Sequence, residues 1–163
     1  MSKTTRRPAP VLPASADDRL WQSSVGGGLS FVLARANALS LAGVHAALAE
    51  HGLRVRQYSV LAIAAGGLRP SQRELSDFLR LDPSQIVAVV DHLESRDLVR
   101  REPDPTDRRA KVVVATEAGK ALFRRARAAA DQADEEFLAR LDAAEVAALA
   151  PALRKLAWAP AVD

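Results

Sequence analysis

The sequence predicts a mainly α-helical fold with a small β-wing: a winged helix-turn-helix domain flanked by helices on both sides. Three observations support this. Residues 71–96 hold two short helical patterns separated by a tight turn. Residues 98–116 hold two runs with strand character, joined by a charged loop. The segments on either side are apolar at helical spacing, which is typical of helices that pack on one another.

Residues 1–18 are rich in proline and small polar residues, and Lys3, Arg6 and Arg7 make them basic. We expect a disordered arm here, because such a segment cannot bury enough apolar surface to fold. The alternative is an arm that contacts phosphates and adds salt-dependent affinity for DNA.

Residues 29–50 are apolar on nearly every side of a helix. A domain of this size can hardly bury such a helix alone, so a second copy of the chain is its natural cover. We expect His51 and Gly52 to end the helix. Residues 54–65 then predict another core helix, closed by two glycines.

The first helix of the helix-turn-helix is expected to begin at Ser71. Serine is a good N-cap, and Glu74 stands three residues later, where it completes a capping box. The apolar stripe of this helix is formed by Leu75, Phe78 and Leu79.

The second helix is expected to start at Asp82, with its side chain as the cap and Pro83 at the first helical position. It should end near Arg96, with Asp97 in the left-handed conformation. Helical spacing turns one set of residues toward the core: Ile86, Val89, Val90 and Leu93. It leaves another set outward, where a groove would meet it: Ser84, Gln85, Val87, Ala88, Asp91 and His92.

Residues 98–102 and 111–116 predict the two strands of the wing. Asp107 precedes two arginines at the tip of the loop and is suited to hold one guanidinium by a charge-assisted bond. Positive charge is therefore expected where DNA would lie, on Arg100, Arg101, Arg108, Arg109 and Lys111.

Residues 117–141 predict a long helix, and Asp142 with Glu145 predicts a capping box for a last helix. Pro151 is expected to bend or break that last helix. Its apolar seam is formed by Val146, Leu149, Leu153 and Leu156. We therefore assign residues 19–53 and 117–163 to N- and C-terminal dimerisation helices, and residues 54–116 to a DNA-binding domain.

The run Asp104-Pro-x-Asp107-Arg108-Arg109-Ala110, followed by a valine-rich strand and Thr116-Glu117-Ala118-Gly119, resembles the wing of the MarR-type winged-helix transcription regulators. Leu75-Ser-x-x-Leu79, Pro83-Ser84 and Val90-Asp91-x-Leu93-Glu94 match the helix-turn-helix of the same family. The resemblance covers about residues 29–157. It implies a cytoplasmic homodimeric regulator, commonly a repressor, that binds double-stranded DNA at a palindromic operator.

Two departures from the family pattern concern the reading of bases. Ala88 and His92 stand where arginine is common, and Asp97 stands where glycine is usual. A winged-helix dimer that acts through protein–protein contacts, with weak or no sequence-specific DNA binding, is therefore the alternative function. The basic wing opposes that alternative.

The recognition helix is expected to read base edges through Ser84 and Gln85, since glutamine pairs bidentately with adenine. Simple helix capping is the alternative role. Arg108 and Arg109 are expected to enter the minor groove, or else to form a solvated surface pair held by Asp107. The DNA-binding candidates are Ser84, Gln85, Val87, Ala88, His92, Arg108, Arg109 and Lys111, with Asp107 as support for the wing. At least one of Asp82, Asp91 and Asp97 is expected to be structural, because carboxylates near the groove would repel phosphate, and Asp91 is suited to pair with a neighbouring arginine.

The resemblance also implies release of the DNA by a small phenolic or aromatic-acid ligand, bound between the dimer helices and the DNA-binding lobe. The candidates to line such a site are Trp21, Arg35, His45 and Tyr58, which combine aromatic surface with cationic or polar anchors. Ordinary core or surface roles are the alternative for each of them.

At 163 residues, with 48% hydrophobic and 26% charged residues, the chain suits one globular domain, and its net charge of +3 permits a nucleic-acid partner. There is no cysteine, and the three histidines show no ligand spacing, so no metal, cofactor or thiol switch is expected. The lack of a G-x-S-x-G elbow or another nucleophile with a positioned base argues against an enzyme. No apolar run approaches the ~18 residues needed to span a bilayer, so we expect no membrane partner and a cytoplasmic protein that joins the nucleoid when bound to DNA.

Overall fold

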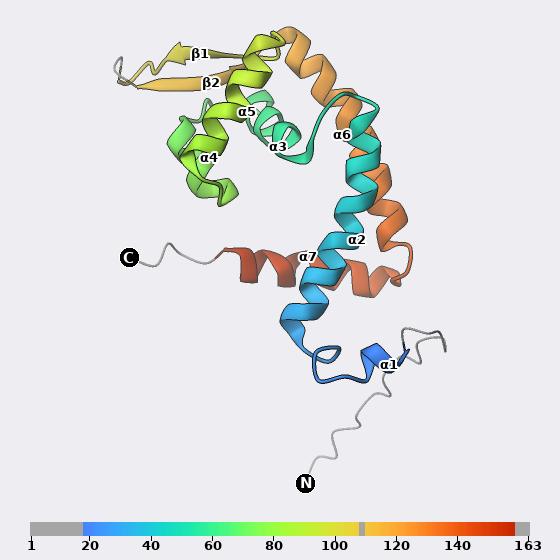
Figure 1. Cartoon of the computed structure of the whole chain (residues 1–163). Coiled ribbons are helices and arrows are strands. Elements are labelled where there is room, and N and C mark those ends of the chain that lie inside the picture. The colour runs from blue at the N-terminus through green and yellow to red at the C-terminus, as the bar shows by residue number, and fades with distance from the viewer. Residues whose placement is uncertain (1–17, 108–109, 159–163) are drawn as a thin grey trace. The chain divides into compact units, whose positions relative to one another are not determined.

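The computed structural model describes residues 18–107 and 110–158, and the chain divides into two compact units, residues 1–39 and 40–163. The first unit holds α1 (Asp18–Trp21) and the start of α2 (Leu29–Ala49). The second unit holds the rest of α2 and the elements α3 (Val55–Ala65), α4 (Gln72–Leu79), α5 (Pro83–Ser95), β1 (Val99–Pro103), β2 (Lys111–Ala115), α6 (Glu117–Leu138) and α7 (Ala143–Ala157) (Figure 1). The expected class, mainly helical with a two-stranded wing, is confirmed. Most of the predicted arm lies outside the described residues.

Side-chain caps start the helices where the sequence places them. Ser71 Oγ accepts from the Glu74 N–H at 3.2 Å, and Glu74 Oε2 accepts from the Ser71 N–H at 2.7 Å. Asp142 and Glu145 form the same reciprocal box at the start of α7. Both expected capping boxes are therefore confirmed.

The Asp82 side chain makes no capping bond at the start of α5, contrary to expectation. The Asp82 carbonyl instead accepts from the Gln85 and Ile86 N–H groups, at 2.9 and 3.2 Å. Pro83 does occupy the first turn, where its missing N–H costs nothing. The turn before α5 is tight because Arg80 adopts a left-handed conformation with φ of +52°.

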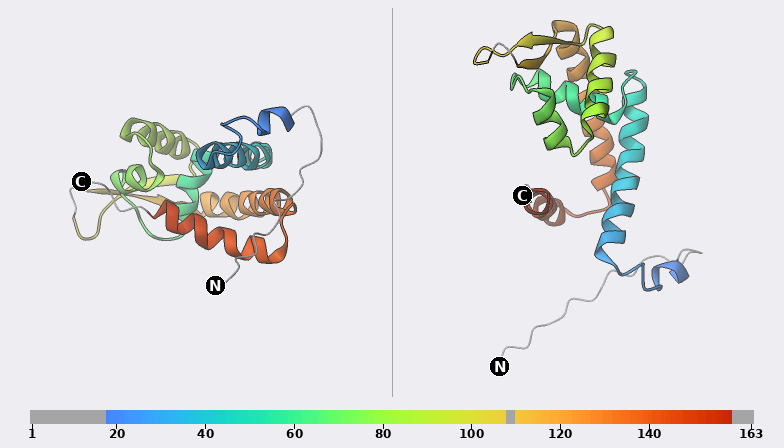
Figure 2. Two further views of the ribbon diagram at one scale, coloured as in Figure 1. Left: turned by 90° about the horizontal axis from the view of Figure 1, so that it is seen from below. Right: turned by 60° about the vertical axis from the view of Figure 1, so that its left-hand side comes forward.

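The wing is an antiparallel hairpin that projects from the helices (Figures 1 and 2), with Val99 opposite Ala115 and Pro103 opposite Lys111. Strand β1 runs one residue later than predicted. The segment before α4 pairs with this hairpin, because Ser71 forms a β-bridge with Val112 and the Val113 N–H donates to the Pro70 carbonyl at 2.8 Å. The start of the helix-turn-helix is therefore attached to the wing.

One core joins the helices to the wing. Helix α3 contacts both α5 and α6, and strand β2 contacts α3, α4 and α6. The largest fully buried side chains come from α2, α3, α4, α5 and both strands: Leu48, Val60, Leu61, Leu75, Ile86, Val90, Leu93, Val99 and Val113. Helix α5 is thus fixed through its inner side.

The turn between α5 and the wing is closed against the first turn of α6. Asp97 has φ of +54°, as expected. Its carbonyl accepts from Thr116 Oγ1 at 2.6 Å, and the same oxygen of Thr116 accepts from the Gly119 N–H at 3.0 Å. A Cβ on Gly119 would lie 1.9 Å from the Leu98 carbonyl oxygen, so only glycine allows this approach.

Three further expectations are corrected. Phe78 is 74% exposed and does not belong to the apolar stripe that packs α4. Helix α6 ends at Leu138 and not near residue 141. Helix α7 runs on through Pro151 without a break. In the described part of the chain, the apolar seam of α7 has no fully buried residue.

Helix α2 has 21 residues, and its best 18-residue window has a mean hydropathy of 1.4. It is long and apolar enough to cross a membrane by length and composition, contrary to the expectation that no such run exists. A core or interface helix meets the same test. Of the window, 11% is buried in the single chain, and the buried residues of α2 are Val44 and Leu48.

Candidate nucleic-acid interface

Helix α5 carries two opposite faces. Ile86, Val90 and Leu93 are completely buried. The predicted DNA-binding residues of this helix are all exposed: Ser84, Gln85, Val87, Ala88 and His92. The helical pattern therefore distinguished core from surface correctly, and Val89 is the half-buried residue at the boundary.

The polar side chains at the start of α5 are available to a partner. Within residues 18–107 and 110–158, neither the Ser84 hydroxyl nor the Gln85 carboxamide takes part in an intramolecular hydrogen bond. Both side chains are exposed on the first turn of the helix. A hydroxyl and a carboxamide in this place can contact phosphates or base edges.

Arg101 of β1 holds α5 to the wing and to α4. Its Nη2 lies 2.6 Å from Asp91 Oδ1, its Nη1 pairs with Glu94 Oε2, and its backbone N–H donates to Glu94 Oε1 at 3.0 Å. Gln72 Oε1 of α4 accepts from Nε at 2.9 Å and from Nη2 at 2.7 Å. The side chain of Arg101 is 17% exposed. The expected pairing of Asp91 with an arginine is confirmed.

A second ion cluster includes Arg100, the neighbour of Arg101 on β1. Glu102 accepts from Arg100 Nε at 2.5 Å and pairs with Arg69 Nη2 at 2.8 Å. These hydrogen bonds, from Arg100 first and then Arg69, hold the pKa of Glu102 below its ordinary value. Arg100 and Arg101 therefore both lie on the wing, as expected, and each is paired with carboxylates.

The loop of the wing is ordered by a turn at Asp104. Thr106 donates to Asp104 Oδ1 through its N–H and its hydroxyl, both at 2.7 Å, which lowers the pKa of Asp104. The Asp107 carbonyl accepts from the Ala110 N–H at 2.9 Å, and Asp107 is exposed at the tip. Arg108 and Arg109 lie outside the described residues. Lys111 is exposed at the start of β2.

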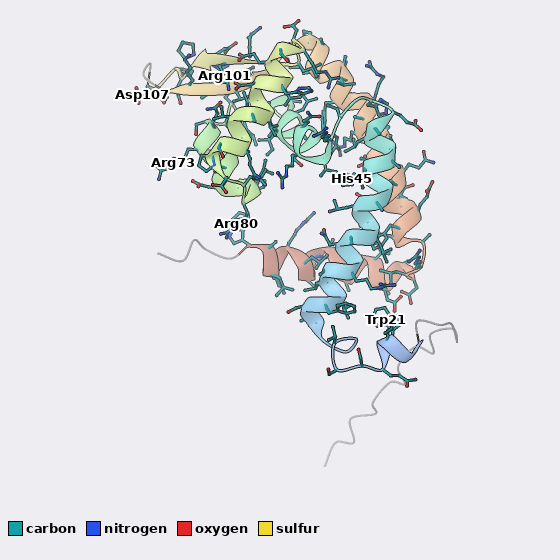
Figure 3. All side chains as sticks on the ribbon, viewed as in Figure 1. Trp21, His45, Arg73, Arg80, Arg101 and Asp107 are labelled. Carbon is teal, nitrogen blue, oxygen red and sulfur yellow. The ribbon has the colours of Figure 1, made fainter. Side chains whose placement is uncertain are left out.

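Two exposed cations were missed by the sequence-based reasoning. Arg73 on α4 has a side chain that is 92% exposed, with Asp77 at 3.9 Å, and Arg80 is exposed in the turn before α5. Figure 3 shows Arg73 and Arg80 on the α4 side and Asp107 at the end of the wing. The position of Arg80 between two capped helices was the signal that could have identified it.

A pocket of about 850 Å³ lies between the end of α2, the start of α3 and α5. Its lining contains four basic side chains and no carboxylate among the described residues: His45, Arg54, Arg56 and His92. Gln85, Ala88 and Val89 of α5 complete the wall on that side. Gly52, another lining residue, accepts from Arg96 Nη1 through its carbonyl at 2.7 Å. An anion is the ligand that this charge distribution favours.

The four predicted ligand-binding residues lie in three places. In the first unit, the Arg35 guanidinium carbon is 5.3 Å from the ring centroid of Trp21, beside a cavity of about 80 Å³. In the second unit, His45 lines the large pocket. Tyr58 packs against Phe123, with ring centroids 5.8 Å apart, and burial raises its pKa, with a smaller effect of Asp131. The described residues contain no group of three or more side chains placed to hold a metal ion.

A family model described as the MarR family matches residues 51–110. The transcriptional regulatory protein assigned to the hcr operon of Thauera aromatica is 32% identical over 146 residues, which are 88% of each chain. The HTH-type transcriptional repressor NicR of Pseudomonas putida is 38% identical over 86 residues, 53% of this chain and 54% of that protein. The crystal structure of CouR from Rhodococcus jostii RHA1 bound to p-coumaroyl-CoA shares 37% identity and a TM-score of 0.78, and the match covers 87% of this chain and 100% of that one.

Proposed function

The chain belongs to the MarR family of transcriptional regulators, and from that premise we propose that it is a homodimeric, sequence-specific repressor that binds a palindromic operator. The observation that carries the proposal is the outer face of α5. Ile86, Val90 and Leu93 are completely buried, while the side chains of Ser84 and Gln85 stay exposed and make no hydrogen bond within the described chain. A helix held in this way is suited to enter a major groove.

The cations of the winged lobe, residues 55–115, support DNA as the partner. Three cations are exposed, Arg73 on α4, Arg80 in the turn before α5 and Lys111 at the start of β2, and two more arginines follow Asp107 in the sequence of the wing loop. We assign phosphate contacts to Arg73 and Arg80, because the first helix of a helix-turn-helix crosses the DNA backbone. Arg108 and Arg109 are assigned to the minor groove.

A second copy of the chain is the proposed cover for α2. In the first unit, its apolar residues are widely exposed: Leu29 at 70%, Phe31 at 39%, Val32 at 38%, Leu33 at 39% and Leu39 at 46%. An exposed apolar stretch of this length usually marks an interface. Arg35 and Asn37 lie within the same stretch, which suits a protein partner better than lipid.

We assign the large pocket to an anionic effector with an aromatic or acyl body, such as an aromatic carboxylate or a thioester of coenzyme A. The four basic lining residues support an anion, and the CouR relative was crystallised with p-coumaroyl-CoA. Because Gln85, Ala88 and His92 belong to the pocket wall, a ligand there would press on the recognition helix. Binding of the effector would then lower the affinity for DNA.

The rival function, a protein-binding dimer with little DNA reading, is favoured by the exposed apolar residues of the winged lobe. Leu68 is 77% exposed and Phe78 is 74% exposed. The rival predicts that a pull-down with the protein captures a partner that binds through Leu68 and Phe78. It also predicts that random competitor DNA abolishes all binding to DNA.

The proposed function is tested with the purified full chain and the DNA upstream of its own gene, at about 0.15 M salt with excess random competitor. Saturable binding that resists the competitor supports the repressor. Leu33→Asp is expected to give a monomer by light scattering and to weaken this binding, whereas Leu68→Asp on the winged lobe should stay dimeric. A wild-type monomer, or binding that vanishes with competitor, would contradict the proposal.

A further inference from the structure

The outermost stripe of α5 consists of small and apolar side chains. Ser84, Val87, Ala88 and Asp91 are spaced at i, i+3, i+4 and i+7, opposite the buried stripe of the helix. Val87 is 40% exposed. A β-branched residue lowers helix propensity, and at this position it does little for the core. Its presence is explained better by a contact that forms only with a partner.

The stripe cannot read guanine in the usual way. That contact needs arginine or lysine paired with O6 and N7, and residues Pro83–Ser95 contain neither. The guanidinium of Arg101, which reaches Asp91 of this stripe, bonds Asp91, Glu94 and Gln72. The carboxylate of Asp91 is engaged in the same network. The chemistry that the exposed face of α5 leaves for base edges is a hydroxyl, a carboxamide, an imidazole and methyl groups.

The methyl groups match one base feature. In the major groove, only thymine presents a methyl group, and apolar side chains discriminate it by contact. We propose that Val87 and Ala88 read thymine methyl groups, so that each operator half-site carries A·T pairs at the steps that face them. Gln85 is exposed on the same helix, one turn before Val89. It is placed there to pair with a nearby adenine. This inference rests on the proposed function, the entry of α5 into the major groove.

The test begins with a randomised duplex pool long enough for two half-sites one helical turn apart, selected on the full-length protein. The enriched duplex is then synthesised with single thymines replaced by uracil, which removes one methyl group and keeps base pairing. At the facing thymines, binding should weaken about fourfold per methyl group. Uracil at the flanks should change nothing.

Val87→Ala supplies the matching protein change. It should bind the thymine duplex more weakly, and uracil at the step that faces residue 87 should cost it less affinity than it costs the wild-type protein. Leu68→Ala, which shortens an exposed apolar side chain outside α5, should keep the full uracil penalty. Melting curves check that both variants fold.

Three results would overturn the inference. If replacing each thymine of the enriched duplex with uracil has no effect on binding, the proposed function stands and thymine reading is ruled out. Enriched half-sites with G·C pairs at every selected position would also leave the proposed function standing and rule out thymine reading. A pool that yields no enriched sequence would overturn the proposed function and this inference with it.

Discussion

Arg101 Nη2 lies 2.6 Å from Asp91 Oδ1, and this contact joins the wing to the outward face of the recognition helix. A carboxylate at that position would repel phosphate if it were alone. The guanidinium cancels its charge and, through Glu94 and Gln72, fixes the angle between the helix, α4 and the wing. We therefore expect Arg101 to act as a positioning residue for DNA binding.

Replacing Arg101 with methionine keeps the apolar stem and removes the bonds. We expect the free energy of unfolding to fall by about 1–3 kcal/mol, because charged and polar partners lose their donor. DNA affinity should fall further at conditions where the variant is fully folded, since Asp91 and Glu94 would face phosphate without a counter-charge. Urea denaturation and DNA titration measure the two effects.

Arg100→Met is the matched control for Arg101→Met. Arg100 is the adjacent residue of β1, its side chain is 62% exposed, and it bonds Glu102 alone among the described carboxylates. Loss of the Arg100 side chain should lower the free energy of unfolding by less than about 1 kcal/mol, as for exposed ion pairs. Equal effects of the two substitutions on stability and DNA binding would remove the positioning role of Arg101.

Arg109→Ala at the wing tip should weaken operator binding by about 1–3 kcal/mol without unfolding the protein. The reason is the loss of a cation from the narrow minor groove, where negative potential is concentrated. Titration of labelled operator measures it, with Arg125→Ala on α6 as a charge-matched control outside the winged lobe. Unchanged affinity in a folded Arg109→Ala variant would end the minor-groove assignment.

Gly119→Ala should destabilise the protein severely, by about 3 kcal/mol or more, because the new Cβ would overlap the Leu98 carbonyl. The clash would push α6 away from the turn that follows α5. Gly27→Ala meets no atom within 4 Å and should be nearly neutral. Thermal unfolding of the two variants distinguishes them, and a fully stable Gly119→Ala would contradict the packing of α6.

Ser71→Ala should lower the free energy of unfolding by about 1 kcal/mol near neutral pH, because it removes the side-chain cap of α4. The Ser71 N–H and hydroxyl lower the pKa of Glu74. A lowered pKa in the folded state gives stability that is present above the unfolded value of 4.5 and is lost as pH falls through the folded value. The penalty of Ser71→Ala should therefore shrink below about pH 4, and a constant penalty down to pH 2 would contradict the capping box.

Local signals in the sequence predicted much of the fold. The capping box at Ser71, the left-handed Asp97 and the buried stripe of α5 were all predicted, because each depends on residues within one or two helical turns. The wing was predicted for the same reason, to within one residue at β1.

The sequence predicted an arginine partner for Asp91 but neither which arginine it is nor the rest of the network. Arg100 and Arg101 are adjacent arginines on one strand, and only the fold brings Gln72, 29 residues away, to Arg101. The large pocket joins three segments that are distant in sequence, so Arg54 and Arg56 gave no signal. Phe78 matched a helical stripe, yet the spacing could not tell that the core leaves it outside.

Hydroxyl-radical footprinting of the protein on its selected duplex tests the central claim most directly. A dimer that reads a palindrome with two copies of α5 should protect two equivalent patches, with centres about one helical turn or 34 Å apart, at protein concentrations that leave random duplex untouched. A uniform, sequence-independent protection that fades with salt would show charge-driven binding alone and contradict the operator-binding function.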